Sequence, residues 1–207
     1  MKKVSSKVVE RLLIYRRLLR LYMQTDGPNI YSHQLSRMTG FSSAQVRRDL
    51  MEIGYFGSSA HGYDAEELLK SIDEFVNISE DFSIALVGLG QLGRAILDYF
   101  QGHGPNLRIE VGFDINPQKI DRVIQGCRCF HVDRMDEVLK NTNILVGIIA
   151  VPATNAQDIA DRFISNGINS LLNYTPTRLQ LPPHVFVENI DLMNSIEKAI
   201  FFARRPR

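Results

Sequence analysis

The sequence predicts an α/β protein with an N-terminal winged helix-turn-helix domain, a Rossmann domain built on a doubly wound parallel sheet, and a closing helix. Three observations lead to this prediction. The first 50 residues hold ten Lys or Arg against three Asp or Glu, a net charge of +7, whereas the rest of the chain carries −6. Strand and helix patterns alternate after residue 83, and a Gly-x-Gly-x-x-Gly turn follows the first strand. We expect domains over residues 1–80, 81–190 and 191–207.

The basic segment begins with the pattern of two helices. Apolar residues at helical spacing, with arginines between them, predict an amphipathic helix over residues 5–24. Ser32 is expected to cap a short second helix whose inward side chains are Leu35 and Met38. Gly40 can supply the sharp turn that follows it. This is the first half of a helix-turn-helix motif.

The next helix, over residues 43–53, is the part that we expect to read DNA. Ser42 or Ser43 caps it, and its apolar side chains share one face. The candidate DNA-binding residues are Ser43, Ala44, Gln45, Arg47 and Arg48. Glutamine and arginine can read adenine and guanine edges, alanine can contact a thymine methyl, and Arg47 is better placed for a phosphate. The alternative, a solvated polar face, leaves the basic charge of this segment unexplained.

The segment after the reading helix predicts a wing and then a change of architecture. Residues 54–63 are rich in glycine and aromatic residues, which favours a small β-hairpin, and Asp64 can cap a helix over residues 65–76. Expected strands of the second domain are residues 83–87, 108–113, 144–151, 170–173 and 185–188. Expected helices are residues 92–101, 135–140, 155–166 and 191–203. Near-continuous apolar strands indicate a parallel sheet covered on both faces.

The glycine-rich turn predicts a dinucleotide site. Gly88 permits the tight turn, Gly90 lets the backbone approach a pyrophosphate, and Gly93 lets helix and strand pack closely. The turn opens a helix at Gln91 and Leu92, whose free N–H groups and dipole favour the pyrophosphate. We therefore expect these five residues to bind the cofactor.

Asp114 indicates which dinucleotide is bound. It ends the second strand of the domain, 21 residues after Gly93, where an acidic side chain hydrogen-bonds the adenosine ribose. A 2′-phosphate would face this carboxylate, so NAD(H) is favoured over NADP(H). Coenzyme A or another adenine nucleotide is the main rival ligand.

The candidate residues favour a regulator over an enzyme. The five histidines are scattered without a repeated spacing, and only a short segment follows the last strand, so neither a catalytic acid/base nor a substrate domain is evident. The cofactor is then a signal rather than a reagent. Two alternatives stay open: a small NAD-dependent oxidoreductase with an accessory domain, and a winged-helix protein that responds to coenzyme A or to no ligand.

Cysteine usage and hydropathy predict the compartment. Cys127 and Cys129 are two residues apart on an expected strand, so both point to one face of the sheet. Without a nearby pair of histidines they make a poor zinc site, and we interpret them as reduced packing residues. No apolar run of about 18 residues is present. We expect a cytoplasmic protein that binds no metal and no membrane.

Several motifs, taken in order, resemble the Rex family of redox-sensing repressors over nearly the whole chain. They are residues 43–50, the Gly-x-Phe-Gly…Gly-Tyr segment at 54–63, the Gly-x-Gly-x-x-Gly turn, residues 173–176 (Asn-Tyr-Thr-Pro) and residues 187–192. The resemblance implies a homodimer with exchanged C-terminal helices that binds a palindromic operator. It also implies that NADH releases the protein from DNA and that NAD⁺ does not. Genes of NADH reoxidation and of fermentative or anaerobic metabolism would then be repressed until NADH accumulates.

The resemblance also implies roles for individual residues. The three turn glycines and Asp114 match the positions that hold the adenosine and pyrophosphate half of the cofactor. Val151 and Pro152 match positions near the nicotinamide half. Arg17, Tyr99 and Asp191 match a switching group in which the aspartate exchanges partners between tyrosine and arginine across the dimer.

Two departures from the family pattern bear on DNA binding and dimerisation. Ser58 and Ser59 stand in the wing where relatives often carry Lys or Arg, so we expect a weaker wing contact with DNA. The closing helix ends in Arg204-Arg205-Pro206-Arg207, which shortens the segment available for exchange.

Overall fold

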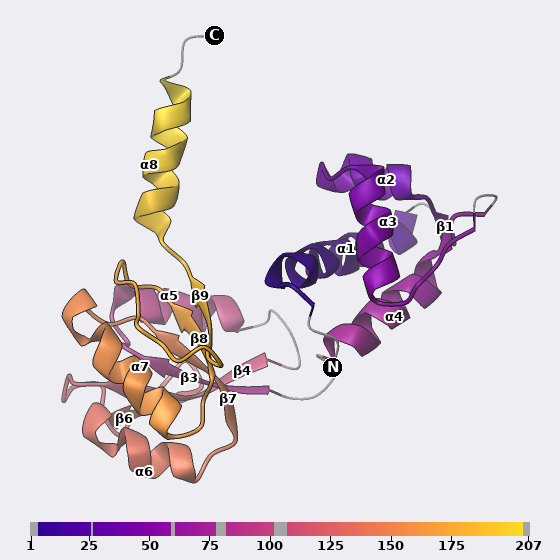
Figure 1. Ribbon diagram of the computed structural model, residues 1–207. Coiled ribbons are helices and arrows are strands. Elements are labelled where there is room, and N and C mark those ends of the chain that lie inside the picture. The colour runs from indigo at the N-terminus through magenta and orange to yellow at the C-terminus, as the bar shows by residue number, and fades with distance from the viewer. Residues whose placement is uncertain (1–3, 26, 59–60, 78–81, 102–106, 205–207) are drawn as a thin grey trace. The chain divides into compact units, whose positions relative to one another are not determined.

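The computed structural model describes residues 4–25, 27–58, 61–77, 82–101 and 107–204. Contacts within the chain divide it into two compact units, Met1–Glu80 and Asp81–Arg207 (Figure 1). The closing helix, which the sequence analysis sets apart, falls within the second unit.

The first unit is a small helical domain with a two-stranded sheet. Its elements are α1 (Ser6–Thr25), β1 (Asn29–Ile30), α2 (Ser32–Thr39), α3 (Ser43–Glu52), β2 (Tyr63–Asp64) and α4 (Ala65–Val76). Helix α1 buries one stripe at helical spacing, made of Val8, Leu12, Tyr15, Leu19 and Tyr22. This stripe packs with apolar residues of α2, α3 and α4 into a single core.

The turn between α2 and α3 confirms one sequence prediction and corrects two. Gly40 adopts the left-handed conformation with φ 76°, as expected for the sharp turn. Ser32 is not the cap of α2, because Tyr31 holds that position and its backbone N–H donates to Gln34 Oε1 at 2.8 Å. Met38 is 40% exposed rather than inward. The cap thus lies one residue earlier than predicted.

The segment of the predicted wing continues into a strand that pairs with an earlier part of the chain. An isolated antiparallel bridge joins Ser58 to Gly62, and β2 pairs in antiparallel fashion with β1, where no strand was expected. Among the described residues of the segment 54–63, this antiparallel bridge is the part of the predicted hairpin that the structure shows. Ser59 lies outside the described residues. Asp64 caps α4 as predicted, accepting from the Glu67 N–H at 2.9 Å.

The second unit is a seven-stranded sheet with the Rossmann strand order. Its strands are β3 (Phe82–Val87), β4 (Leu107–Asp114), β5 (Val123–Ile124), β6 (Cys127–His131), β7 (Ile144–Ile149), β8 (Ser170–Asn173) and β9 (Phe186–Asn189). They run in the order β5-β6-β4-β3-β7-β8-β9, all parallel except β5. Without β5 this is the order 3-2-1-4-5-6 of dinucleotide-binding sheets.

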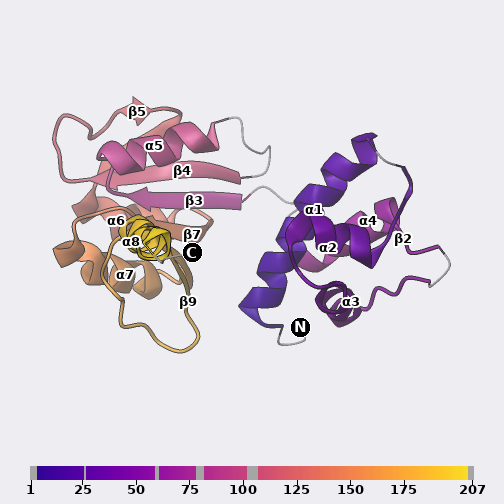
Figure 2. The ribbon, with the colours of Figure 1, turned by 90° about the horizontal axis from the view of Figure 1, so that it is seen from above.

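Helices cover both faces of this sheet. They are α5 (Gln91–Phe100), α6 (Met135–Lys140) and α7 (Ala156–Ser165), with the short helices η1 (Val132–Arg134) and η2 (Ala153–Asn155). Figure 2 shows α5 on one side of β3 and β4, with α6 and α7 on the other. Each side has its own apolar core, which confirms the doubly wound arrangement.

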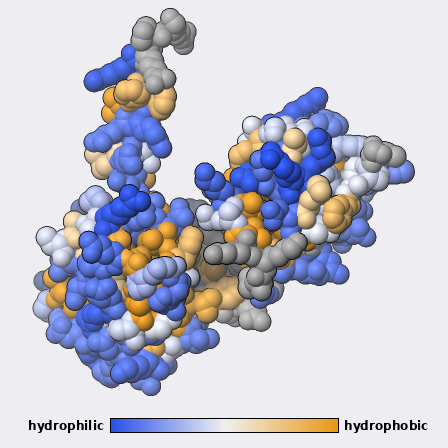
Figure 3. All heavy atoms as spheres, viewed as in Figure 1, coloured by the Kyte–Doolittle hydropathy of each residue, from blue (hydrophilic) through white to orange (hydrophobic). Residues whose placement is uncertain are grey.

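The cysteines and the last helix complete the second unit. Cys127 and Cys129 are both fully buried with free thiols in the core under α5, so the prediction of packing residues on one face is confirmed. Helix α8 (Leu192–Ala203) has no buried residue. Apolar side chains are exposed along it (Figure 3). No helix among the described residues is long and apolar enough to cross a membrane.

Candidate functional site

A cavity opens where the chain order of the sheet reverses, between β3 and β7. Val87, the last residue of β3, pairs with Phe113 and with Ile149, so the carboxyl ends of three central strands lie level. Ligands of open α/β sheets bind in the crevice at this position. The structure places a cavity of about 330 Å³ there.

The cavity brings together most of the residues predicted for the cofactor. Gly88, Gly90, Asp114, Val151 and Pro152 all line it. Strand β7 ends at Ile149, two residues earlier than expected, which leaves the last two of these residues in the crevice rather than in the sheet.

The three glycines of the turn differ in what surrounds them. Gly88 has φ 95°, and a side chain there would strike the Ala150 carbonyl. A Cβ on Gly93 would collide with the carbonyl oxygen of Gly88, because helix and turn are in direct contact. A Cβ on Gly90 would meet no atom within 4 Å, so this position faces open space inside the cavity. The turn is thus closed on its protein side and open where a pyrophosphate would lie.

Gln91 and Leu92 contribute to the site through the backbone. They form the first turn of α5, and neither side chain lines the cavity. The first N–H groups of a helix have no partner within the helix, and its dipole is positive there. The predicted role of these two residues therefore reduces to their N–H groups.

Asp114 is held in place by three hydrogen bonds. Its carboxylate is 8% exposed and accepts from the N–H groups of Leu89 and Asn116, both at 2.8 Å, and from Lys119 Nζ at 2.9 Å. Burial raises the pKa of Asp114, but the hydrogen bonds, that of Lys119 above all, outweigh burial and hold the pKa below its usual value. A carboxylate has about four acceptor positions. One is left for a ribose hydroxyl.

Sequence reasoning missed several residues of the cavity. Lys119 also lines it, on a turn without periodicity, and only its closeness to Asp114 in the chain could have indicated it. Asn155, Asp158 and Arg162 line it as well. They recur at helical spacing, just before α7 and within it, which was the available signal.

The first unit carries the second candidate site, the exposed face of α3. Ser42 caps the helix, and its Oγ accepts from the Gln45 N–H at 3.2 Å. Ala44, Arg47 and Arg48 are exposed, whereas Ser43 is partly covered. The polar face expected from the helical wheel is thus the face that solvent reaches.

A buried ion pair fixes α3 against α1. Asp49 is 1% exposed and accepts two hydrogen bonds from the Arg11 guanidinium, both at 2.7 Å, and one from the Tyr15 hydroxyl at 2.8 Å. Burial raises the pKa of Asp49, but these donors, Arg11 first, reverse the shift and lower it below its usual value. Burial and then Asp49 raise the pKa of Tyr15. This link between Arg11 and Asp49 could not be predicted from the charge pattern of the segment.

The network extends to two predicted DNA-contacting residues. Gln45 donates from Nε2 to Asp49 at 2.8 Å and accepts on Oε1 from Arg48 Nη2 at 3.2 Å. Arg47 Nη1 donates to Ser32 Oγ at 3.1 Å. Both the nitrogen and the oxygen of the Gln45 amide are thus hydrogen-bonded within the protein. Base reading by this residue stays a prediction.

The three residues of the implied switch lie on separate elements. Arg17 lies on the exposed side of α1, in the first unit, and Tyr99 is exposed on α5. Asp191 caps α8, accepting from the Asn194 N–H at 2.9 Å. The partner exchange involves two copies of the chain and stays a prediction.

Comparison with known proteins places both units in one family. Sequence models of two families match: the CoA binding domain over residues 79–177 and the putative DNA-binding protein N-terminus over residues 3–50. The redox-sensing transcriptional repressor Rex of Desulfitobacterium hafniense is 37% identical over 96% of this chain and 95% of its own. The chain belongs to the Rex family. Rex of Limosilactobacillus reuteri is 36% identical, covering 98% and 95% of the two chains.

Solved Rex structures share the fold over nearly the whole chain. The crystal structure of RSP, a Rex-family repressor, matches with a TM-score of 0.87 at 29% identity, covering 98% of this chain and 95% of that one. RSP in complex with β-NAD⁺ and operator DNA matches with a TM-score of 0.90 at 30% identity, covering 98% of this chain and 94% of that one. RSP in complex with β-NADH matches with a TM-score of 0.84 at 30% identity, covering 98% of this chain and 95% of that one.

Proposed function

We propose that this chain is a DNA-binding transcriptional repressor that senses the NADH/NAD⁺ ratio. NAD⁺ leaves it bound to a palindromic operator, and NADH releases it, so genes of NADH reoxidation are expressed when NADH accumulates. The observation that carries the proposal is the switch-point cavity, in which Gly88, Gly90 and Asp114 meet, on the same chain as a reading helix. RSP, of the same family, is solved with β-NAD⁺ and operator DNA and also with β-NADH.

The proposed cofactor contacts follow from the cavity. The N–H groups of the first turn of α5 bind the pyrophosphate, and Asp114 accepts from the adenosine ribose. Val151 and Pro152, which also line the cavity, contact the nicotinamide half. The cofactor is a regulatory ligand, and the chain is a regulator rather than an enzyme.

The proposed DNA contacts lie on α3. Arg48 and Ala44 face base edges, Arg47 and the helix start at Ser43 face phosphates, and Gln45 leaves Asp49 to read a base when DNA is bound. The wing contributes less than in relatives, because Ser58 carries no charge.

The proposed assembly is a homodimer through α8. Six apolar side chains on this helix are exposed in the single chain: Leu192, Met193, Ile196, Ile200, Phe201 and Phe202. Such a face needs a partner. A second copy of the chain supplies it, and Arg17, Tyr99 and Asp191 form the switch across the dimer. The protein acts in the cytoplasm, where its operator is.

The test is fluorescence anisotropy of a labelled palindromic operator, titrated with NADH against NAD⁺ at fixed salt, because affinity for DNA depends steeply on salt. NADH should release the operator. Arg48→Ala should lose about 1–3 kcal/mol of base discrimination. Lys70→Ala removes the same charge from an exposed position on α4 and should bind the operator like the parent.

The cofactor half of the proposal has its own control. Asp114→Ala should weaken NADH binding about tenfold or more, since a hydrogen bond to a charged group is lost. Operator binding by this variant should persist and resist NADH. Calorimetry with coenzyme A beside NADH tests the rival ligand, and tighter binding of coenzyme A would refute the proposed cofactor.

A further inference from the structure

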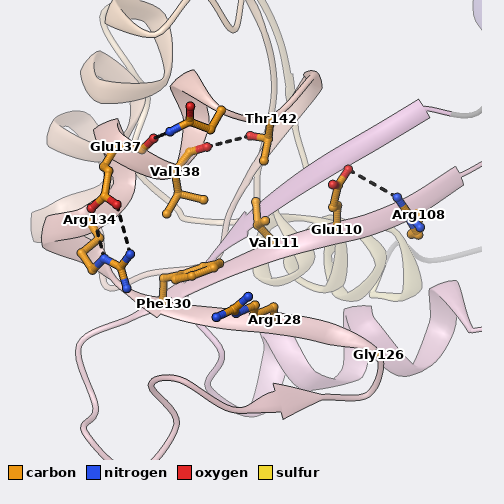
Figure 4. A pocket seen from close by; sticks show the side chains of 11 residues that line it. Arg108, Glu110, Val111, Gly126, Arg128, Phe130, Arg134, Glu137, Val138 and Thr142 are labelled. Carbon is orange, nitrogen blue, oxygen red and sulfur yellow. Dashed lines mark hydrogen bonds and ion pairs between the residues drawn. The ribbon is translucent and has the colours of Figure 1, made fainter.

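A second cavity, larger than the nucleotide site, lies between β4, β6 and α6. Its volume is about 520 Å³, within the usual range for small-molecule sites. Figure 4 shows Phe130, Val111 and Val138 facing it from strands and helix, with arginines around them. It shares no lining residue with the nucleotide cavity, so both can be occupied together.

Three arginines line this second cavity. The guanidinium carbons of Arg128 and Arg134 lie 5.1 and 5.3 Å from the centroid of the Phe130 ring, at cation–π distance. Arg134 also pairs with Glu137 at 3.1 Å, and Arg108 lies 3.5 Å from a carboxylate. Arg128 has no carboxylate within ion-pair distance in the described parts of the chain. The aromatic ring holds this guanidinium in place while its N–H donors stay available.

An irregularity in β4 shapes the same cavity. Ile109 pairs with Ile84, but Val111 pairs with the next residue of β3, Ala85, so Glu110 is an extra residue in the strand. Such bulges re-aim side chains and are frequent next to functional sites. Here the bulge lets both Glu110 and Val111 line the cavity, although they are adjacent in a strand.

We propose that this second cavity binds a small organic oxyanion, a phosphate or carboxylate group carried on an apolar body. The planar fork of Arg128 matches either group with two parallel hydrogen bonds. Val111, Phe130 and Val138 supply apolar contacts for the body of the ligand. With three arginines against two glutamates, the lining favours an anion.

The wall between the two cavities is a pair of aromatic rings. Phe130 of the second cavity and Phe113 of the nucleotide cavity have ring centroids 6.2 Å apart. The turn η1 continues the wall, with Val132 lining the nucleotide cavity and Arg134 lining the second cavity. The anion site is thus a neighbour of the nucleotide site and separate from it.

Calorimetry on the full chain tests the site with two anionic probes, phenyl phosphate and benzene-1,3-dicarboxylate, and with uncharged benzyl alcohol. At least one anion should bind, which also identifies the oxyanion, and benzyl alcohol should not. Arg128→Ala should raise the Kd about tenfold or more. Arg122→Ala removes the same charge from an exposed position outside the cavity and should leave the Kd unchanged.

A third variant guards against loss of folding. Arg128→Lys keeps the charge but loses the fork, so its Kd should fall between those of the parent and Arg128→Ala, and circular dichroism should give the parental melting curve. The proposal is overturned if neither anion binds, if Arg128→Ala binds like the parent, or if Arg122→Ala loses as much. The second of these results would place the anion at the basic reading head or at the start of helix α5, and the third would show that binding depends on net charge rather than on this cavity.

Discussion

Asp49→Asn should destabilise the reading domain strongly while leaving the shape of the side chain almost unchanged. In the parent, Asp49 accepts four hydrogen bonds, two of them from Arg11 and one each from Tyr15 and Gln45. An amide supplies one oxygen and one NH₂ group. At least one of these donors then faces another donor, and the Arg11 charge loses its counter-ion.

The magnitude follows from burial. Removing one partner of a buried ion pair costs about 3–5 kcal/mol. Because the Arg11 side chain is 17% exposed, water solvates part of its unpaired charge. We therefore expect Asp49→Asn to lower the free energy of unfolding by about 3 kcal/mol, the lower end of this range. A domain of about 80 residues has a free energy of unfolding of roughly 4–12 kcal/mol. The loss corresponds to a fall in Tm of about 12–24 °C.

Differential scanning calorimetry and far-ultraviolet circular dichroism can measure this change; the chain has no tryptophan to follow by fluorescence. Asp73→Asn is the matched control, because Asp73 also pairs α1 with another helix, through Arg16 and Arg20, but is 34% exposed. A pair this open to water is worth about 0–1 kcal/mol. Equal, small shifts in both variants would refute the argument that burial decides the cost. NADH affinity should be unchanged in both.

Three further predictions follow from the same geometry. Because the pKa of Asp49 is lowered in the folded state, the ionised Asp49 stabilises the folded state above about pH 4, and this stabilisation is lost as pH falls through the folded-state pKa. The urea midpoint of the parent should therefore drop on acidification more than that of Asp49→Asn. Gly90→Ala should keep the parental Tm but weaken NADH binding, whereas Gly93→Ala should lower the Tm; the reverse pattern would contradict the assigned roles. Burial raises the pKa of the Cys127 thiol to about 12 and that of Cys129 to about 11, so a thiol reagent at pH 8 should react only as fast as the protein unfolds.

Patterns that repeat along the chain were enough to predict the architecture. A 3.6-residue period places the stripe of α1, and a strand followed by Gly88, Gly90 and Gly93 specifies the turn that opens the next helix. Asp114 could be located in the same way, because it follows the apolar residues of the second strand of this domain. These features depend on residues close in sequence.

Features that depend on distant residues could not be predicted. The pairing of Asp49 with Arg11 joins residues 38 positions apart, and nothing in either segment marks them as partners. The antiparallel pair of β1 and β2 likewise joins Asn29 to Asp64. The second cavity depends on a bulge at Glu110, which alternation of apolar residues cannot reveal.

The two units keep separate hydrophobic cores. Among the residues that the structure describes, the core of the first unit is built from residues up to Val76, and the two cores of the sheet from residues after it. A reading domain from one relative can therefore be joined to the sheet of another without opening either interior. Over evolution, such recombination lets operators diverge while the redox sensor is inherited whole, and in the laboratory it offers a way to place chosen promoters under the control of the cell's reducing power.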